Sequence, residues 1–369
     1  MNQLFRWDQT GLFLLALAAG ILPFAVPEVC AAALREGLTL CSGPLLLSLF
    51  PFLVVSRLLI QCPESDLLAL PFRLAAWGIG IRTPCAARVL CIGFLGGFAP
   101  AASAAAQAVR TGQLTAEEAD ALLPACICSG PSFVVLTVGQ SLLGSAELGV
   151  LLFASQITAN YLTAALLNRF AGVRSVKPGS AAQASPAPPR LDEILADAAI
   201  TYCKLCGFIL FFRMLAAGAG ALLPAGAGTL CAVLLEVCSG CDLASRTGRW
   251  GSLLCCAALS VQGLSVLLQV RTICPPEMTL RPLYRARMLH LPLSLALFYL
   301  LLPGGEADVF STLPARVLLM RRVPPDCALL VFAVCCMAAC TLRSGIRQVE
   351  QKQMARNAGG CCINSKTLL

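Results

Sequence analysis

The chain has 369 residues, of which 58% are hydrophobic and only 12% are charged, and its mean hydropathy is +0.80. A soluble domain carries roughly 25% charged residues, so this composition excludes an ordinary soluble protein and predicts a multi-pass membrane protein whose main partner is the lipid bilayer. Lysine and arginine exceed the acidic residues by 8. In a membrane protein such an excess marks cytoplasmic loops, so we expect no nucleic-acid partner.

Hydropathy predicts an all-α fold, a polytopic transmembrane helix bundle. The segments that are apolar enough to be membrane helices are 11–28, 38–61, 119–140, 147–168, 200–223, 250–270, 288–303 and 325–342. Two further apolar stretches, 85–109 and 227–245, are rich in Gly, Ala, Ser and Pro. Non-helical backbone at membrane depth is tolerated only where protein or water surrounds it. We therefore expect two re-entrant or interrupted helix segments at these stretches.

A linker rich in Pro, Ala and Ser, residues 171–190, contains cations and no acidic residue. Such a segment cannot bury a core, and its cations predict a cytoplasmic position. The chain is therefore expected to consist of five parts, which are an N-terminal transmembrane helix (1–29), a first half (30–170), the linker (171–190), a second half (191–305), and a C-terminal transmembrane helix with a basic tail (306–369).

The two halves repeat the same order of features. Each has a glycine-broken segment, around Gly93 to Pro100 in the first half and around Glu236 to Gly240 in the second. Each then closes on a helix interrupted by polar residues. Paired broken segments in two halves indicate a transporter-like binding site at the interface of a two-fold repeat.

Glu236 is the residue that most needs explanation. An acidic side chain at the bilayer centre costs roughly 2.5 to 3.5 kcal/mol, so it requires a partner, water or a function. We expect the helix to break at Ser239 and Gly240 and to expose backbone groups that bind a small polar solute or a cation beside Glu236. The alternative is that Glu236 pairs with Lys204 or Arg213.

Other polar groups can complete such a site. Gln262, Ser265 and Gln269 are three and four residues apart, so they are expected to share one helix face and to offer ligands to a nucleoside-like molecule. The alternative is that these side chains hold helices together. The remaining candidate site residues are Gly263 in the second half and the kinked run of Ser129, Gly130 and Pro131 in the first half.

The 21 cysteines and the single histidine predict neither a metal site nor a cofactor. Most cysteines lie in apolar runs, where thiols pack as small hydrophobes, and the CxxC of Cys203 and Cys206 lacks the second pair that zinc requires. His290 follows Arg285 and Arg287, so we expect all three at the membrane interface. The sequence contains no recognisable catalytic set, and an enzyme is the least favoured class.

Three motifs carry a resemblance to a known family. They are CICSGPSF at 126–133, LLEVCSG at 234–240 and SVQGLSVLLQV at 260–270. With these motifs, and in the order of elements over residues 30–305, the chain resembles the sporulation integral membrane proteins of the YlbJ type, which belong to the nucleoside-transporter gate-domain group.

The resemblance implies two gate-like halves built from paired helix hairpins, in a bacterial cell membrane. It also implies a transporter or channel for a small polar solute or ion in spore formation. The alternative is a non-transporting membrane scaffold for spore envelope assembly, and a homo-oligomer is left open.

Overall fold

The computed structural model of the chain describes residues 9–62, 65–172 and 191–302, and every regular element within these ranges is a helix. The predicted all-α fold is therefore confirmed. Residues 173–190 of the linker, the segment 325–342 and the basic tail lie outside the described residues. The helices of the first half and its N-terminal extension are α1 (Gln9–Ala25), α2 (Pro27–Ser42), α3 (Pro44–Gln61), α4 (Ser65–Leu68), α5 (Leu70–Gly78), α6 (Pro84–Gly96), α7 (Phe98–Arg110), α8 (Ala116–Cys126), the π-helix η1 (Ser132–Leu142) and α9 (Ala146–Ala171). Those of the second half are α10 (Leu191–Leu222), α11 (Ala225–Leu235), α12 (Val237–Ser245), the short 3₁₀ helix η2 (Gly248–Trp250), α13 (Gly251–Val261), α14 (Gly263–Ile273) and α15 (Arg281–Leu301).

The described helices have the dimensions and surface of a membrane bundle. Four helical stretches in these ranges are long and apolar enough to cross a bilayer, and they are Pro27–Leu47, Ala146–Ala171, Leu191–Leu222 and Gly248–Ile273. Large apolar side chains such as Phe24, Leu74, Phe170 and Met288 are exposed on the outside. Apolar surface on this scale suits lipid rather than water, so the fold is a helical bundle of membrane type.

The two glycine-rich stretches are interrupted helices, as predicted. Gly97, at φ +81°, separates α6 from α7, and Glu236, in an extended conformation, separates α11 from α12. The second interruption does not lie at Ser239 and Gly240, which are inside α12. The reason is that the Glu236 side chain caps the first amide groups of α12, so the helix restarts directly after it.

Three of the other predicted segments are each divided into two helices. Segment 119–140 is split into α8 and η1 by residues 127–131, and segment 250–270 is split into α13 and α14 at Gln262, which has φ +62°. Segment 38–61 is split at Gly43, because Pro44 has no amide hydrogen with which to continue α2. The interruptions at 127–131 and at Gln262 fall at the polar residues that predict a break in the closing helix of each half, whereas the break at Gly43 was not predicted.

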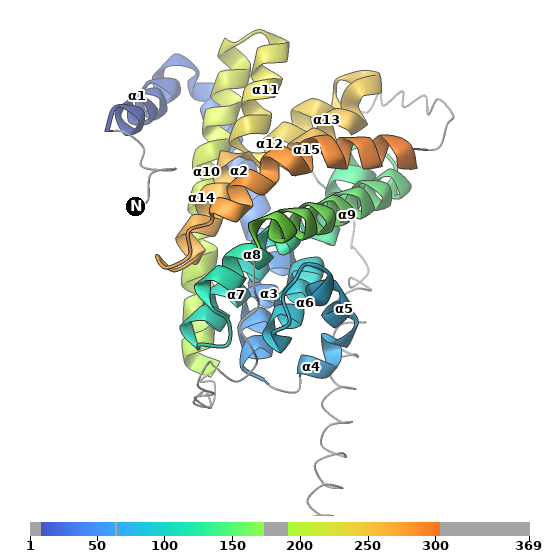
Figure 1. Cartoon of the computed structure of the whole chain (residues 1–369). Coiled ribbons are helices and arrows are strands. Elements are labelled where there is room, and N and C mark those ends of the chain that lie inside the picture. The colour runs from blue at the N-terminus through green and yellow to red at the C-terminus, as the bar shows by residue number, and fades with distance from the viewer. Residues whose placement is uncertain (1–8, 63–64, 173–190, 303–369) are drawn as a thin grey trace, which may run out of the picture.

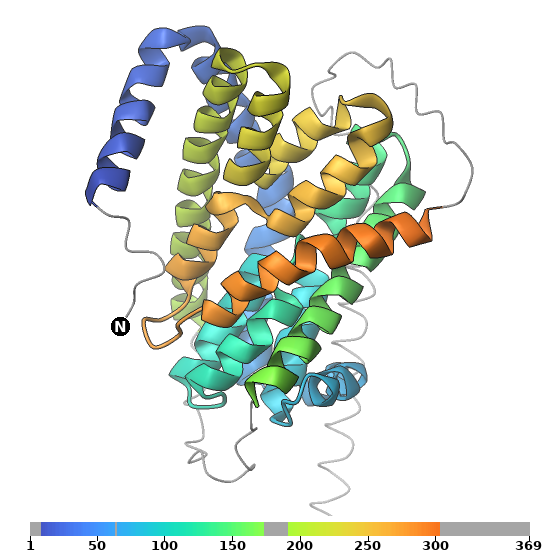
Figure 2. The ribbon, with the colours of Figure 1, turned by 45° about the horizontal axis from the view of Figure 1, so that its top comes forward.

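Corresponding elements of the two halves lie at opposite ends of the bundle. Figures 1 and 2 show α6 and α7 toward one end, and α11 and α13 toward the other. The helices that follow the interrupted segments, α9 and α15, lie side by side and contact each other across the middle, while α10 packs along α2 and α3.

Candidate functional site

The helix interruptions are packed against one another in pairs. In the first half, a Cβ atom at Gly97 would lie 2.7 Å from the backbone nitrogen of Gly130. In the second half, a Cβ atom at Gly263 would lie 2.9 Å from the backbone nitrogen of Glu236. Both glycines also have a positive φ, so the close approach and the backbone conformation each require glycine. Each half therefore brings its two interruptions into direct contact.

The carbonyl of Ile127 connects the two halves. Its oxygen accepts hydrogen bonds from Gln262 Nε2 at 3.2 Å, Asn160 Nδ2 at 3.3 Å and Arg287 Nη2 at 2.9 Å. This oxygen is not used in a helix, because Ile127 is extended and follows the last residue of α8, and Pro131 has no amide hydrogen to donate to it. The interruption of the first half thus supplies the acceptor, and the interruption at Gln262 in the second half supplies a donor.

Arg287 and His290 are buried among the helices, at 7% and 0% exposure, a position that hydropathy does not indicate. They are buried because α15 begins at Arg281, well before the predicted helix at 288–303, and carries both residues inward. Arg287 Nη2 also donates to Asn160 Oδ1 at 3.1 Å, and within the described ranges no acidic side chain pairs with it. A sequence signal was present, since Arg287, His290 and Ser294 are three and four residues apart and lie on one helix face.

Glu236 is 2% exposed, and both of its carboxylate oxygens accept hydrogen bonds from α12. Oε1 accepts from the amide of Cys238 at 2.8 Å, and Oε2 accepts from the amide of Ser239 at 2.7 Å. The proposed pairing with Lys204 or Arg213 is not found in the described part of the chain, where Arg213 instead pairs with Glu36 at 2.8 Å. Glu236 therefore stabilises the N-terminus of α12 as a charged cap.

A cavity of about 70 Å³ lies beside the interruptions and is lined by both halves. The first half contributes Gly96 and Phe98, on either side of Gly97, together with Ser129 and Gly130. The second half contributes polar and apolar groups on α10, α12 and α14. They are Ile209, Glu236, Val237, Cys238, Val266 and Gln269. The structure thus brings Ser129, Gly130, Glu236 and Gln269 from the predicted residues to one cavity.

The predicted polar face of Gln262, Ser265 and Gln269 is divided. Ser265 and Gln269 lie on α14, where Gln269 Nε2 donates to Ser265 Oγ at 3.0 Å. Gln262 lies before α14, in a left-handed conformation, and extends toward Ile127. The face is divided because a residue with positive φ does not continue the helical direction of the residues that follow it.

The other predicted residues have packing or terminal positions. Ser239 and Gly240 are within α12, and a Cβ atom at Gly240 would lie 2.8 Å from the Cα atom of Val233 on α11. Pro131 directly precedes η1. At the other end of η1, the backbone amide of Leu143 donates to the carbonyl of Val138, five residues earlier, at 2.9 Å. π-helical turns frequently occur near functional sites.

Several buried polar atoms near the interruptions have no hydrogen-bond partner among the described residues. They are Gln262 Oε1, Gln269 Oε1, Arg287 Nε and His290 Nδ1. An unpaired buried polar group costs roughly 1 to 3 kcal/mol. Of these residues, Gln269 lines the cavity, so its unpaired oxygen is available to a polar ligand there.

Comparisons with models of known protein families, with curated proteins and with solved structures find no match to this chain. The described cysteines are all free thiols, and most are buried. Within the same ranges, no group of three or more His, Cys, Asp or Glu side chains is arranged to hold a metal ion. The candidate site therefore consists of amide, carboxylate, guanidinium and backbone groups.

Proposed function

We propose that this chain is a membrane transporter or channel that binds a small polar solute or an ion where its interrupted helices meet. The observation that carries the proposal is the convergence of four helix interruptions, two from each half, beside a cavity lined by Glu236 and Gln269. Interrupted helices expose backbone amide and carbonyl groups at membrane depth, and carriers use such groups to bind substrates and ions.

The size of the cavity favours a small ligand. Pockets for drug-sized molecules measure roughly 300 to 1,000 Å³, whereas this cavity measures about 70 Å³. An ion or a small solute fits it directly, and a nucleoside-like molecule requires the two halves to move apart. The unpartnered oxygen of Gln269, which lines the cavity, is an acceptor that such a ligand would meet.

The place of this transport in the cell follows from the motif resemblance alone. The chain resembles sporulation integral membrane proteins at CICSGPSF, LLEVCSG and SVQGLSVLLQV. We therefore place the proposed transport in a bacterial cell membrane during endospore formation.

A second candidate function is a non-transporting membrane scaffold for spore envelope assembly. The observation that favours it is that both oxygens of Glu236 are already bound to amides of α12. Asn160 and Gln262 likewise join helices through the carbonyl of Ile127. In a scaffold these polar groups serve only to hold the helices together.

Replacement of Glu236 by glutamine separates the two functions. The amide oxygen of glutamine still accepts one of the two α12 hydrogen bonds, so the loss of the cap costs about 1 kcal/mol, while the charge is removed. We expect Glu236→Gln to accumulate in the membrane and to fail to restore heat-resistant spores in a host that lacks the protein. The measurement is spore yield after heating, with protein levels determined by immunoblot.

Glu236→Asp is the matched control, because it keeps the charge and is a favoured capping residue, and it should restore part of the yield. Equal rescue by Glu236→Gln and the wild type would exclude a functional carboxylate. A loss of spores that parallels a loss of protein would support the scaffold. Failure of the wild type itself to restore spores would exclude the sporulation role.

A further inference from the structure

A second cavity, of about 140 Å³, lies between α3, α7, α10 and α14. Gln269 lines both this cavity and the one beside the interruptions. Three cations, Arg57, Arg110 and Lys204, line it together with one acidic residue, Asp197. The cavity is therefore positively charged, although the basic residues of a membrane protein are ordinarily confined to its loops.

The acidic residue is already neutralised. Arg57, which is 7% exposed, pairs through Nη1 with Asp197 Oδ2 at 2.5 Å. Its other nitrogens donate to Thr201 Oγ1 at 3.4 Å and to Ser103 Oγ at 3.3 Å. This network holds one side of the cavity rigid, and it leaves the charges of Lys204 and Arg110 without an acidic counterpart.

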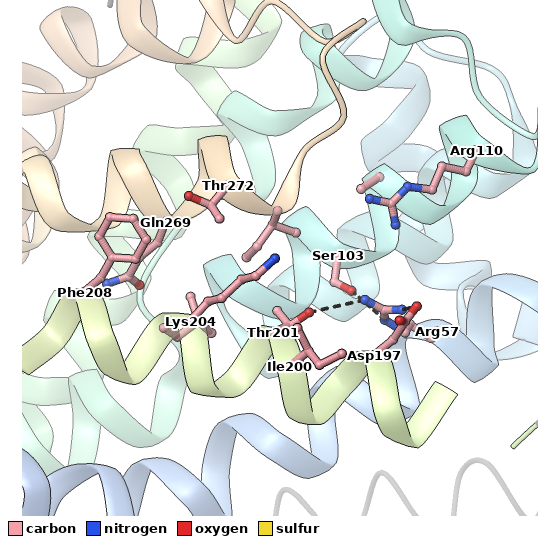
Figure 3. Close-up of a pocket in the computed structure, with 13 residues that line it drawn as sticks. Arg57, Ser103, Arg110, Asp197, Ile200, Thr201, Lys204, Phe208, Gln269 and Thr272 are labelled. Atoms are coloured by element: carbon pink, nitrogen blue, oxygen red, sulfur yellow. Dashed lines mark hydrogen bonds and ion pairs between the residues drawn. The ribbon is translucent and has the colours of Figure 1, made fainter. Parts of the chain in front are cut away.

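Lys204 and Arg110 are exposed and make no hydrogen bond or ion pair with any residue that the structure describes. Figure 3 shows the Lys204 side chain extending from α10 into the cavity, on the side of Gln269 and Thr272, while Arg110 lies at the far side of the cavity beyond Ser103. Two uncompensated cations around one cavity concentrate anions there.

We propose that this cavity binds a phosphate group, carried either by an anionic phospholipid or by a soluble phosphate ester. The donors belong to separate helices and surround the cavity, which matches the tetrahedral set of phosphate oxygens better than the two coplanar oxygens of a carboxylate. Basic pockets between transmembrane helices bind anionic lipid headgroups. Ile200, 55% exposed on the same lining, offers an apolar surface to an acyl chain. The proposal does not rest on the proposed transport, although Gln269 lines both cavities.

The test uses the full-length protein, purified in detergent and stripped of lipid, and compares the wild type with the double variant Lys204→Gln and Arg110→Gln. Both side chains are exposed, so the double variant should fold, which its thermal unfolding verifies. We expect the dissociation constant for phosphatidylglycerol, measured by native mass spectrometry, to rise at least tenfold. Arg285→Gln removes an exposed cation outside the cavity and should bind like the wild type.

Comparing the binding of glycerol 3-phosphate with that of phosphatidylglycerol identifies the source of the phosphate group. Binding of glycerol 3-phosphate that depends on the two cations identifies a soluble ester, and such binding of phosphatidylglycerol alone identifies a lipid. Diacylglycerol, which lacks the phosphate, should not bind at this site. Equal binding of phosphatidylglycerol and glycerol 3-phosphate by the wild type and the double variant would overturn the proposal, and so would succinate binding as tight as that of the phosphate ligands.

Discussion

Gly97→Ala is expected to lower the free energy of unfolding by about 3 to 5 kcal/mol, because two penalties combine. The first is the backbone conformation, at φ +81°, which an alanine side chain disfavours. The second is steric, since the new Cβ atom would lie 2.7 Å from the backbone nitrogen of Gly130. Backbone cannot move aside as a side chain can, so the α6–α7 and α8–η1 interruptions would be forced apart. Unfolding of the purified protein in detergent micelles measures the effect.

The chain contains controls that separate these penalties. Gly112 has φ +69° but nothing within 4 Å of a new Cβ atom, so Gly112→Ala should cost only the conformational strain, about 1 to 2 kcal/mol. Gly207, within α10, also has open space, and Gly207→Ala should stabilise the helix by up to about 1 kcal/mol. Gly263→Ala should behave like Gly97→Ala. If Gly97→Ala costs no more than Gly112→Ala, the interruptions are not packed as described.

Arg287→Met is expected to abolish function without loss of stability. Arg287 is a buried cation without an acidic partner in the described part of the chain, and a charge at membrane depth costs about 2.5 to 3.5 kcal/mol. Methionine has a similar length and no charge. The Ile127 oxygen keeps Gln262 and Asn160 as donors, so the main losses are the hydrogen bond to Asn160 Oδ1 and the long one to the Ser260 carbonyl at 3.5 Å, together about 1 to 3 kcal/mol. The two effects offset each other, and the unfolding free energy should stay constant or rise.

Spore yield and unfolding of the same variant are the two measurements. Arg285→Met makes the same chemical change at an exposed position on the same helix, and it should alter neither quantity. A purely structural Arg287 predicts that Arg287→Met is destabilised, because the buried oxygens of Asn160 and Ser260 lose a donor, at about 1 to 3 kcal/mol for each oxygen left unpaired. Wild-type spore yield from a stable Arg287→Met variant would exclude Arg287 from the functional site.

The interrupted helices show which structural features the local sequence can predict. Glycine, proline and small residues at 85–109 and 227–245 predict an interruption in each stretch, and both are present at Gly97 and Glu236. The exact residue in the second stretch was wrong, because the cap made by the Glu236 side chain decides where α12 begins. Ser and Gly are residue types that often interrupt helices. Here the amide of Ser239 donates to Glu236 Oε2 and Gly240 packs against Val233, and both residues are helical.

The candidate site shows what local sequence does not contain. Glu236 and Gln269 are evident as polar residues in apolar runs, and both line the cavity beside the interruptions. Arg287 was assigned to the interface because it lies beside another cation before an apolar run. Its burial depends on α15 packing against α8, α9 and α13, which are distant in the chain.

The sequence by itself determined an all-α membrane bundle with broken segments in both halves, because hydropathy, glycine content and proline position are properties of neighbouring residues. The tertiary structure alone decided that the Ile127 carbonyl joins Asn160, Gln262 and Arg287, which come from separate helices. It also decided that Arg57, Arg110 and Lys204 surround one cavity. Contacts between residues so far apart in the chain depend on how helices pack, and no local pattern records that packing.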